Sequence, residues 1–174
     1  MSSTPFKTRM NPESLRHFND ALGYAGLKMF RDAWESLQRV SAEHDEELAV
    51  VLLKAEVLNS LGRYSETLLL LGPFVPEHPQ CDTLIIQFAF ATRRADSLDK
   101  AYQILHAAVT VFPKTALILY NYACYCAQLG QHRTALDFLK RAIELEPPYV
   151  RIAQEDEDFL PLCTHPEFIK LTTP

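Results

Sequence analysis

Histidine, cysteine and carboxylate side chains are the groups in this sequence that could perform acid–base, nucleophilic or metal chemistry. Six histidines are spread along the 174 residues, and two of them, His44 and His78, lie in predicted loops 34 positions apart. Two such histidines could share a metal ion, but no carboxylate or cysteine completes a ligand spacing with them. We therefore expect ordinary surface histidines and no metal site.

Four cysteines and one acidic run are the other candidates for chemistry. Cys81, Cys124, Cys126 and Cys163 form no CxxC pair, and side chains two positions apart on one helix diverge. We expect free, partly buried thiols, as in a reducing compartment. The acidic run at residues 155–158 lacks the glycine turn of calcium-binding loops, so we expect it to be a solvated helix end.

Motif and charge patterns narrow the classes of function. The sequence has no HExxH, GxSxG or GxGxxG motif and no phosphate-cradling glycine loop. We expect no catalytic residue and no cofactor, and so a protein that is not an enzyme. The net charge of −5 disfavours nucleic acid and anionic membranes as partners. No apolar run approaches the roughly 20 residues of a membrane span, and the first residues lack the apolar core of a secretory signal, which predicts a cytoplasmic location.

A repeated pattern of small and apolar residues organises most of the chain. In residues 115–147, apolar side chains recur at helical spacing before and after a Leu129-Gly130 break, which predicts two amphipathic helices joined by a tight turn. The pattern recurs every 34 residues without insertion. The positions in register are Ala21, Ala55, Ala89 and Ala123 in the first helices, and Ala33, Thr67, Ala101, Ala135, Leu37, Leu71, Leu105 and Leu139 in the second. Such a period predicts a helical-repeat array, in which stacked helix pairs supply the core that one pair cannot bury.

The period and the small residues resemble the tetratricopeptide repeat (TPR) family, whose units are helix-turn-helix pairs of 34 residues. The resemblance covers residues 11–147. Turn glycines are present in two units, Gly62 and Gly130, whereas Lys28 and Asp96 occupy the same position in the others. The aromatic and Leu-Gly signals of the family's first helix are mostly absent, but four units in unbroken phase are hard to produce by chance.

The resemblance implies an all-α fold, a right-handed helical-repeat solenoid of four TPR-like helix-turn-helix units with a C-terminal capping helix. The expected segments are a flexible arm at residues 1–10, repeats at residues 11–45, 46–79, 80–113 and 114–147, and a capping helix with tail at residues 148–174. A polar cap is needed because the last apolar face would otherwise meet water.

Local signals predict where several helices begin and end. Asn11 and Pro12 favour a helix start, because asparagine caps backbone N–H groups and proline is tolerated in the first turn. The second helix of this unit is expected at residues 30–42. The pair Gly72-Pro73 predicts that the helix from Tyr64 ends or kinks near Leu71, because proline removes a helical hydrogen bond.

In TPR arrays the first helices of successive units line a concave groove, so the resemblance implies a groove that takes a peptide or helix from a partner protein. The repeat phase assigns to this groove Phe18, Asn19 and Leu22, then Leu52, Leu53, Glu56 and Asn59, then Ile86, Gln87, Phe90 and Arg94, and finally Tyr120, Asn121, Cys124 and Gln128. The alternative for several of these residues is burial under the tail or against a neighbouring subunit. Collectively, a row of exposed apolar groups would mark an interface.

The side chains in this row indicate the kind of ligand. Family members that clamp the C-terminal carboxylate of heat-shock chaperones place lysine, arginine and asparagine along the groove. Here the matching sites are mostly apolar, so that clamp is absent. We expect apolar anchoring of a helix or extended segment, with asparagine and glutamine bonding the ligand's backbone. Arg93 and Arg94 add one positive spot that suits an acidic residue of the partner.

The first functional hypothesis is therefore a cytoplasmic adaptor or chaperone that binds a protein segment. The alternative is a self-associating scaffold, a homo-oligomer in which the groove or the Trp34 side is buried against another copy. An enzyme ranks last, because no acid, base and nucleophile are paired.

Overall fold

Residues 10–173 are described by a computed structural model, and they form helices joined by short turns, with no β-strand in that range. They divide into two compact units, residues 10–78 and residues 79–173. The all-α helical-repeat prediction is therefore confirmed for the described residues. None of the helices in residues 10–173 combines the length and the apolar character that a bilayer crossing needs.

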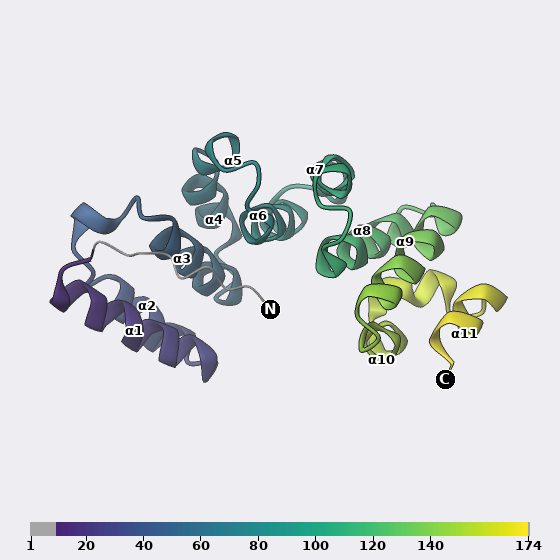
Figure 1. The fold of residues 1–174 in the computed structure, drawn as a ribbon, viewed down its shortest axis with the longest axis horizontal. Coiled ribbons are helices and arrows are strands. Elements are labelled where there is room, and N and C mark those ends of the chain that lie inside the picture. Colours follow the sequence, from purple (N-terminus) through teal and green to yellow (C-terminus); the bar gives the residue numbers. More distant parts are fainter. Residues whose placement is uncertain (1–9, 174) are drawn as a thin grey trace. The chain divides into compact units, whose positions relative to one another are not determined.

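The first unit contains two long helix pairs and two short helical segments. Its elements are α1 (Pro12–Gly26), α2 (Phe30–Leu37), η1 (Ala42–His44), α3 (Leu48–Ser60), α4 (Tyr64–Leu71) and α5 (Phe74–Glu77). Helix α1 packs on α2, α2 on α3, and α3 on α4, as the side-by-side ribbons in Figure 1 show. The core gathers Phe18, Leu37, Val50 and Val57 with Met10, the last residue of the predicted arm. The rest of that arm lies outside the described residues.

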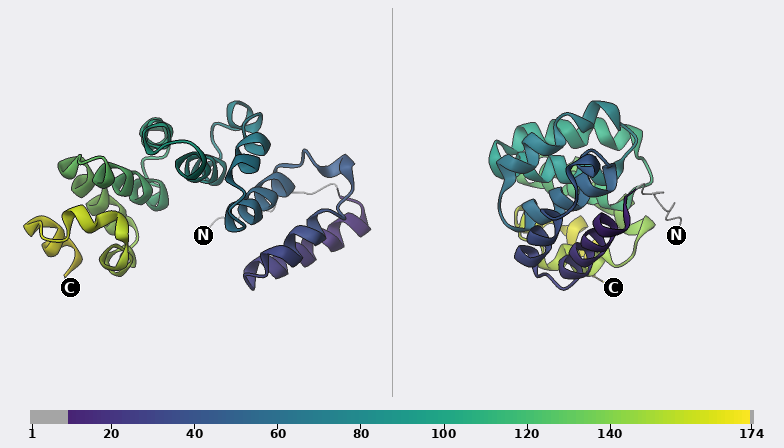
Figure 2. Two further views of the ribbon diagram at one scale, coloured as in Figure 1. Left: turned by 180° about the vertical axis from the view of Figure 1, so that it is seen from behind. Right: turned by 90° about the vertical axis from the view of Figure 1, so that its left-hand side faces the viewer.

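The second unit repeats the pairing and adds the C-terminal elements. These are α6 (Asp82–Ala95), α7 (Leu98–Val111), α8 (Ala116–Gln128), α9 (His132–Leu145), α10 (Tyr149–Glu155), η2 (Glu157–Leu162) and α11 (Pro166–Thr172). Helices α6, α7, α8 and α9 pack in sequence, while η2 returns to pack on α8 (Figure 2). In the segment expected to hold a capping helix and tail, the first helix, α10, ends at Glu155, where Asp156 takes an extended backbone and caps η2.

The residues that define the 34-residue register lie in the cores of both units. Each of the alanines, Thr67 and the leucines named above for this register is at most 1% exposed. A small side chain at a helix crossing lets the two backbones approach, and a leucine fills the space beside it. The 34-residue period of the sequence therefore corresponds to a repeated set of buried residues where the helices pack.

Helix termini follow the local chemistry of the sequence in most places. The Asn11 side chain accepts a hydrogen bond from the Ser14 N–H at 2.9 Å, and Pro12 begins α1, as predicted. Helix α4 ends at Leu71, before Pro73, which confirms the predicted break. Helix α2 ends at Leu37 instead of residue 42, and the chain then turns into η1, so that predicted boundary was too late.

Three of the four turns between paired helices contain a residue in the left-handed backbone conformation. Lys28, Gly62 and Gly130 have φ of 59°, 75° and 73°, the left-handed conformation that ends a helix. Asp96 occupies the same repeat position with φ of −129°, which lies outside the left-handed region. The third repeat therefore makes its turn without a left-handed residue, and Ser97 caps α7 by accepting a hydrogen bond from the Lys100 N–H.

His44 departs from the expectation of a surface histidine. It is buried in η1, where its Nε2 accepts the backbone N–H of Asn11 at 3.2 Å and its Nδ1 lies 2.7 Å from Glu47 Oε1. The ring thus joins the start of α1 to the loop before α3. Its role in the structure is to fix the first unit's N-terminal end.

Candidate protein-interaction site

The groove residues predicted in the first unit have different exposures. On α1, Asn19 and Leu22 are exposed, Leu22 by 46%, whereas Phe18 belongs to the core. On α3, Glu56 is exposed and Leu53 is buried. Leu52 and Asn59, also on α3, are half-buried. The exposed side chains of this set therefore mix apolar and polar groups.

In the second unit, the predicted residues of α6 and α8 differ in what covers them. On α6, Phe90 and Arg94 are exposed, while Ile86 and Gln87 are half-buried. On α8, Tyr120 and Cys124 are buried. Gln128 is exposed, and Asn121 is half-buried and donates to the Leu117 carbonyl at 2.9 Å. The burial on α8 agrees with the alternative that some of these residues lie under the tail.

Tyr120 is the centre of an aromatic contact between α8 and the tail. Its ring stacks on Tyr149 of α10 with centroids 4.5 Å apart and meets the ring of Phe159 of η2 edge-on at 5.6 Å. Phe159 is only 1% exposed. The Tyr120 hydroxyl donates to Asp156 Oδ2 at 2.7 Å. Tyr120, at a predicted groove position, thus binds the tail through both its apolar ring and its hydroxyl group.

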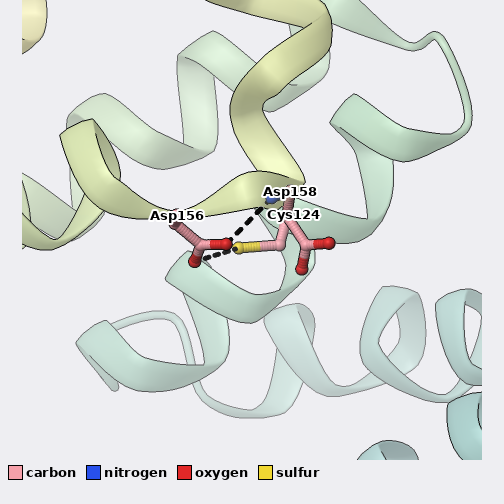
Figure 3. A group of neighbouring side chains, drawn as sticks. All are labelled: Cys124, Asp156 and Asp158. Atoms are coloured by element: carbon pink, nitrogen blue, oxygen red, sulfur yellow. Dashed lines mark hydrogen bonds between the residues drawn. The ribbon is translucent and has the colours of Figure 1, made fainter.

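Cys124, one turn further along α8 than Tyr120, faces the Asp156 carboxylate. Its Sγ lies 3.7 Å from Asp156 Oδ2, and the Asp158 backbone N–H donates to Asp156 Oδ1 at 2.9 Å (Figure 3). Burial raises the pKa of the Cys124 thiol far above its ordinary value, and the two aspartates raise it further. The thiol is therefore protonated and donates to the carboxylate.

Asp158 is bound from two helices. The Arg93 guanidinium on α6 donates through both Nη atoms to its two carboxylate oxygens, each at 2.5 Å, and this forked geometry is the strong form of such a pair. The pKa of Arg93 is raised by this hydrogen bond. The same cation lies 5.0 Å from the centroid of the buried Tyr125 ring. From α8, the Gln128 amide donates to the Asp158 carbonyl at 2.8 Å.

Cys124, Asp156 and Asp158 also form a group whose ligand atoms lie within 4.8 Å of one another. A cation there would have to displace Arg93 from Asp158 and remove the thiol proton of Cys124. The donors already present satisfy these carboxylates, so the arrangement works as a clamp that holds the tail on α6 and α8. The expectation that residues 155–158 form a solvated helix end is wrong for Asp156 and Asp158.

The sequence indicated Arg93 as part of a positive spot but did not assign it to the groove. It did not predict that Asp156, Asp158 and Phe159 belong to the site. Arg93 lies three residues after Phe90, on the same face of α6, so its helical spacing could have included it. The three tail residues lie outside the 34-residue register. No signal within the repeat pattern could have paired them with α8.

Solved structures similar to this chain share its fold. The thermophilic TPR protein TTC0263 of Thermus thermophilus has a TM-score of 0.75 at 19% identity, covering 91% of this chain and 87% of that one. A crystal structure of MamA protein has a TM-score of 0.68 at 14% identity, covering 91% and 86%. Another MamA crystal structure has 0.68 at 16% identity, covering 87% and 90%. No protein-family model matches the sequence, and no curated protein matches it either. The predicted TPR-like fold is confirmed.

Proposed function

We propose that this chain is a protein-interaction module that binds a segment of a partner protein through the first helices of its TPR-like units. The single observation that carries the proposal is that α6 and α8 bind the chain's own tail segment. Arg93, Tyr120 and Gln128 hold a carboxylate, an aromatic ring and a backbone carbonyl of that segment. These are the features by which a groove recognises a peptide.

Exposed side chains at the predicted groove positions of α1, α3 and α6 support the same proposal. Leu22 and Phe90 expose 46% and 37% of their surface at the predicted groove positions, and exposed apolar side chains of this kind suit an apolar group of a partner. Asn19 on α1 and Glu56 on α3 are also exposed and supply polar contacts. We propose an adaptor or chaperone role in the cytoplasm, without catalytic chemistry and without a nucleic-acid or membrane partner.

The test is affinity capture from a lysate of the source cells with wild type and two groove variants. Leu22→Ser and Phe90→Ser each remove an exposed apolar group from a first helix. Leu69→Ser and Val111→Ser are matched controls, because both residues are exposed on second helices. We expect a partner that the control variants retain and at least one groove variant loses. Equal capture by all five proteins would reject the groove as the binding face.

Self-association is the second candidate, favoured by strongly exposed leucines in the first unit. Leu27 and Leu69 expose 72% and 79% of their surface, and side chains of this kind suit burial against a second copy. Light scattering at two protein concentrations separates the candidates. A monomer at both concentrations would exclude the homo-oligomer, whereas a mass that rises with concentration would favour it over the adaptor.

A further inference from the structure

Three positions on α6 correspond to the tail-contacting positions of α8, one 34-residue repeat earlier in the chain. Three side chains along one face of α8 contact the tail: Tyr120, Cys124 and Gln128. Subtracting one repeat of 34 residues gives three positions on α6, occupied by Ile86, Phe90 and Arg94. Because the units share their backbone register, these three side chains, here called the α6 stripe, point from α6 as the tail-binding set points from α8.

The tail is fixed on α8 and does not extend over the whole α6 stripe. Phe159 and Leu162 are 1% and 0% exposed, so releasing the tail would open the core of the second unit. In the α6 stripe, by contrast, Phe90 is 37% exposed and Arg94 is also exposed. A partner segment therefore meets the α6 stripe without displacing the tail.

Arg94 gives this stripe its specificity. Its guanidinium lies 5.4 Å from the centroid of the Phe90 ring, and it forms no ion pair with any residue in the range 10–173. Arg93, its neighbour in the chain, shows what a guanidinium at this end of α6 binds: the forked carboxylate of Asp158. An exposed arginine beside an apolar surface suits a carboxylate that is followed or preceded by an apolar side chain.

We propose that the α6 stripe binds a partner segment that pairs an aspartate or glutamate side chain with an adjacent aromatic or aliphatic residue. The carboxylate is held by Arg94, and the apolar side chain packs on Phe90 and Ile86. The chain's own Asp156–Phe159 segment is the template for this chemistry, because Arg93 of α6 holds its Asp158 carboxylate and Tyr120 of α8 packs on its Phe159 ring. This inference rests on the proposed function, because it assigns the partner chemistry of that same groove.

The probe is a fluorescent peptide with the sequence of residues 155–162, EDEDFLPL, blocked at both ends so that only side chains carry charge. Titration with the full chain is followed by fluorescence anisotropy. We expect Arg94→Gln to weaken binding about tenfold, because a charge-assisted hydrogen bond is lost. Arg133→Gln, an exposed arginine of α9, is the matched control and should bind as wild type does. A peptide with its acids changed to amides should lose as much affinity as the Arg94→Gln variant does.

Hydrogen exchange distinguishes binding at the α6 stripe from displacement of the tail. We expect the peptide to protect α6 while residues 157–162 exchange as before. Faster exchange in residues 157–162 would mean that the peptide displaces the tail, and it would overturn the α6 assignment. Equal binding by Arg94→Gln and wild type, or no binding by wild type, would also overturn it. None of these three outcomes decides the proposed function, which is tested by the lysate capture with the Leu22→Ser and Phe90→Ser variants.

Discussion

Arg93 and Asp158 lie 65 residues apart in the chain, and their side chains form a forked ion pair with both N–O distances at 2.5 Å. The pair joins a first helix of the third repeat to the tail that follows the fourth. The side chains of Arg93 and Asp158 are 22% and 21% exposed, so water screens them only in part. The C-terminal segment is thereby bound to a first helix of the repeats that precede it.

Breaking this pair should destabilise the second unit. We expect Arg93→Gln and Asp158→Asn each to lower the free energy of unfolding by about 1–3 kcal/mol, because each leaves a half-buried partner without its counter-charge. The double variant should lose less than the sum of the two, with a coupling of about 1–2 kcal/mol. Urea unfolding of the four proteins measures this cycle. Strictly additive losses would show that the two side chains do not stabilise each other.

The buried thiols should resist modification in the folded protein. Cys124 and Cys126 are buried, and burial raises the pKa of Cys126 to about 11, whereas Cys163 is exposed. Because the thiolate is the reactive form, we expect the two buried thiols to react at least about a hundredfold more slowly than Cys163 with an aromatic disulfide reagent. Because Cys81 is only half-buried, the test uses the Cys81→Ser/Cys163→Ser double variant, which should lack the fast phase until denaturant exposes its two remaining thiols. A fast phase that survives in the double variant would contradict this assignment.

Alkaline pH should destabilise the second unit through its buried tyrosines. Burial raises the pKa of Tyr125 to about 12, although Arg93 acts in the opposite direction. An unfolded tyrosine ionises near pH 10, so the folded state favours the neutral phenol. Tyr125 therefore contributes its full stability below about pH 10 and loses it as pH rises toward 12, by on the order of 3 kcal/mol. Urea unfolding at a series of pH values should show this fall, and Tyr125→Phe, which keeps the ring, should reduce it.

Glycine should be a better residue than lysine at position 28. Lys28 has φ of 59°, a left-handed conformation that is costly for a residue with a Cβ atom. We expect Lys28→Gly to raise the free energy of unfolding of the first unit by about 0.5–1 kcal/mol. Asp96→Gly is the matched control at the same repeat position. It should destabilise by about 0.5–1 kcal/mol, because φ of −129° gives glycine no advantage and its unfolded chain is more flexible. Stabilisation by both changes would argue that φ does not decide the effect.

Much of the fold was predictable because the repeats encode it locally and several times over. Ala21, Ala55, Ala89 and Ala123 mark helix crossings in four independent places, so one weak signal is confirmed by three others. Caps and breakers such as Asn11 and Pro73 act within a few residues of themselves, and they ended or began helices where expected. The groove assignments on these helices remain predictions, since helical phase gives a direction but says nothing of what covers a side chain.

The sequence alone thus determined the helix pairs and their 34-residue register. These depend on helical periodicity and on turn chemistry, both of which act over short distances along the chain. Only the tertiary structure decided that Asp156, Asp158 and Phe159 meet α6 and α8. A bond such as Arg93 to Asp158 depends on where a non-repeating tail folds back, and neither composition nor period constrains that path. The sequence therefore predicted a solvated acidic run, whereas the fold half-buries the side chain of Asp158.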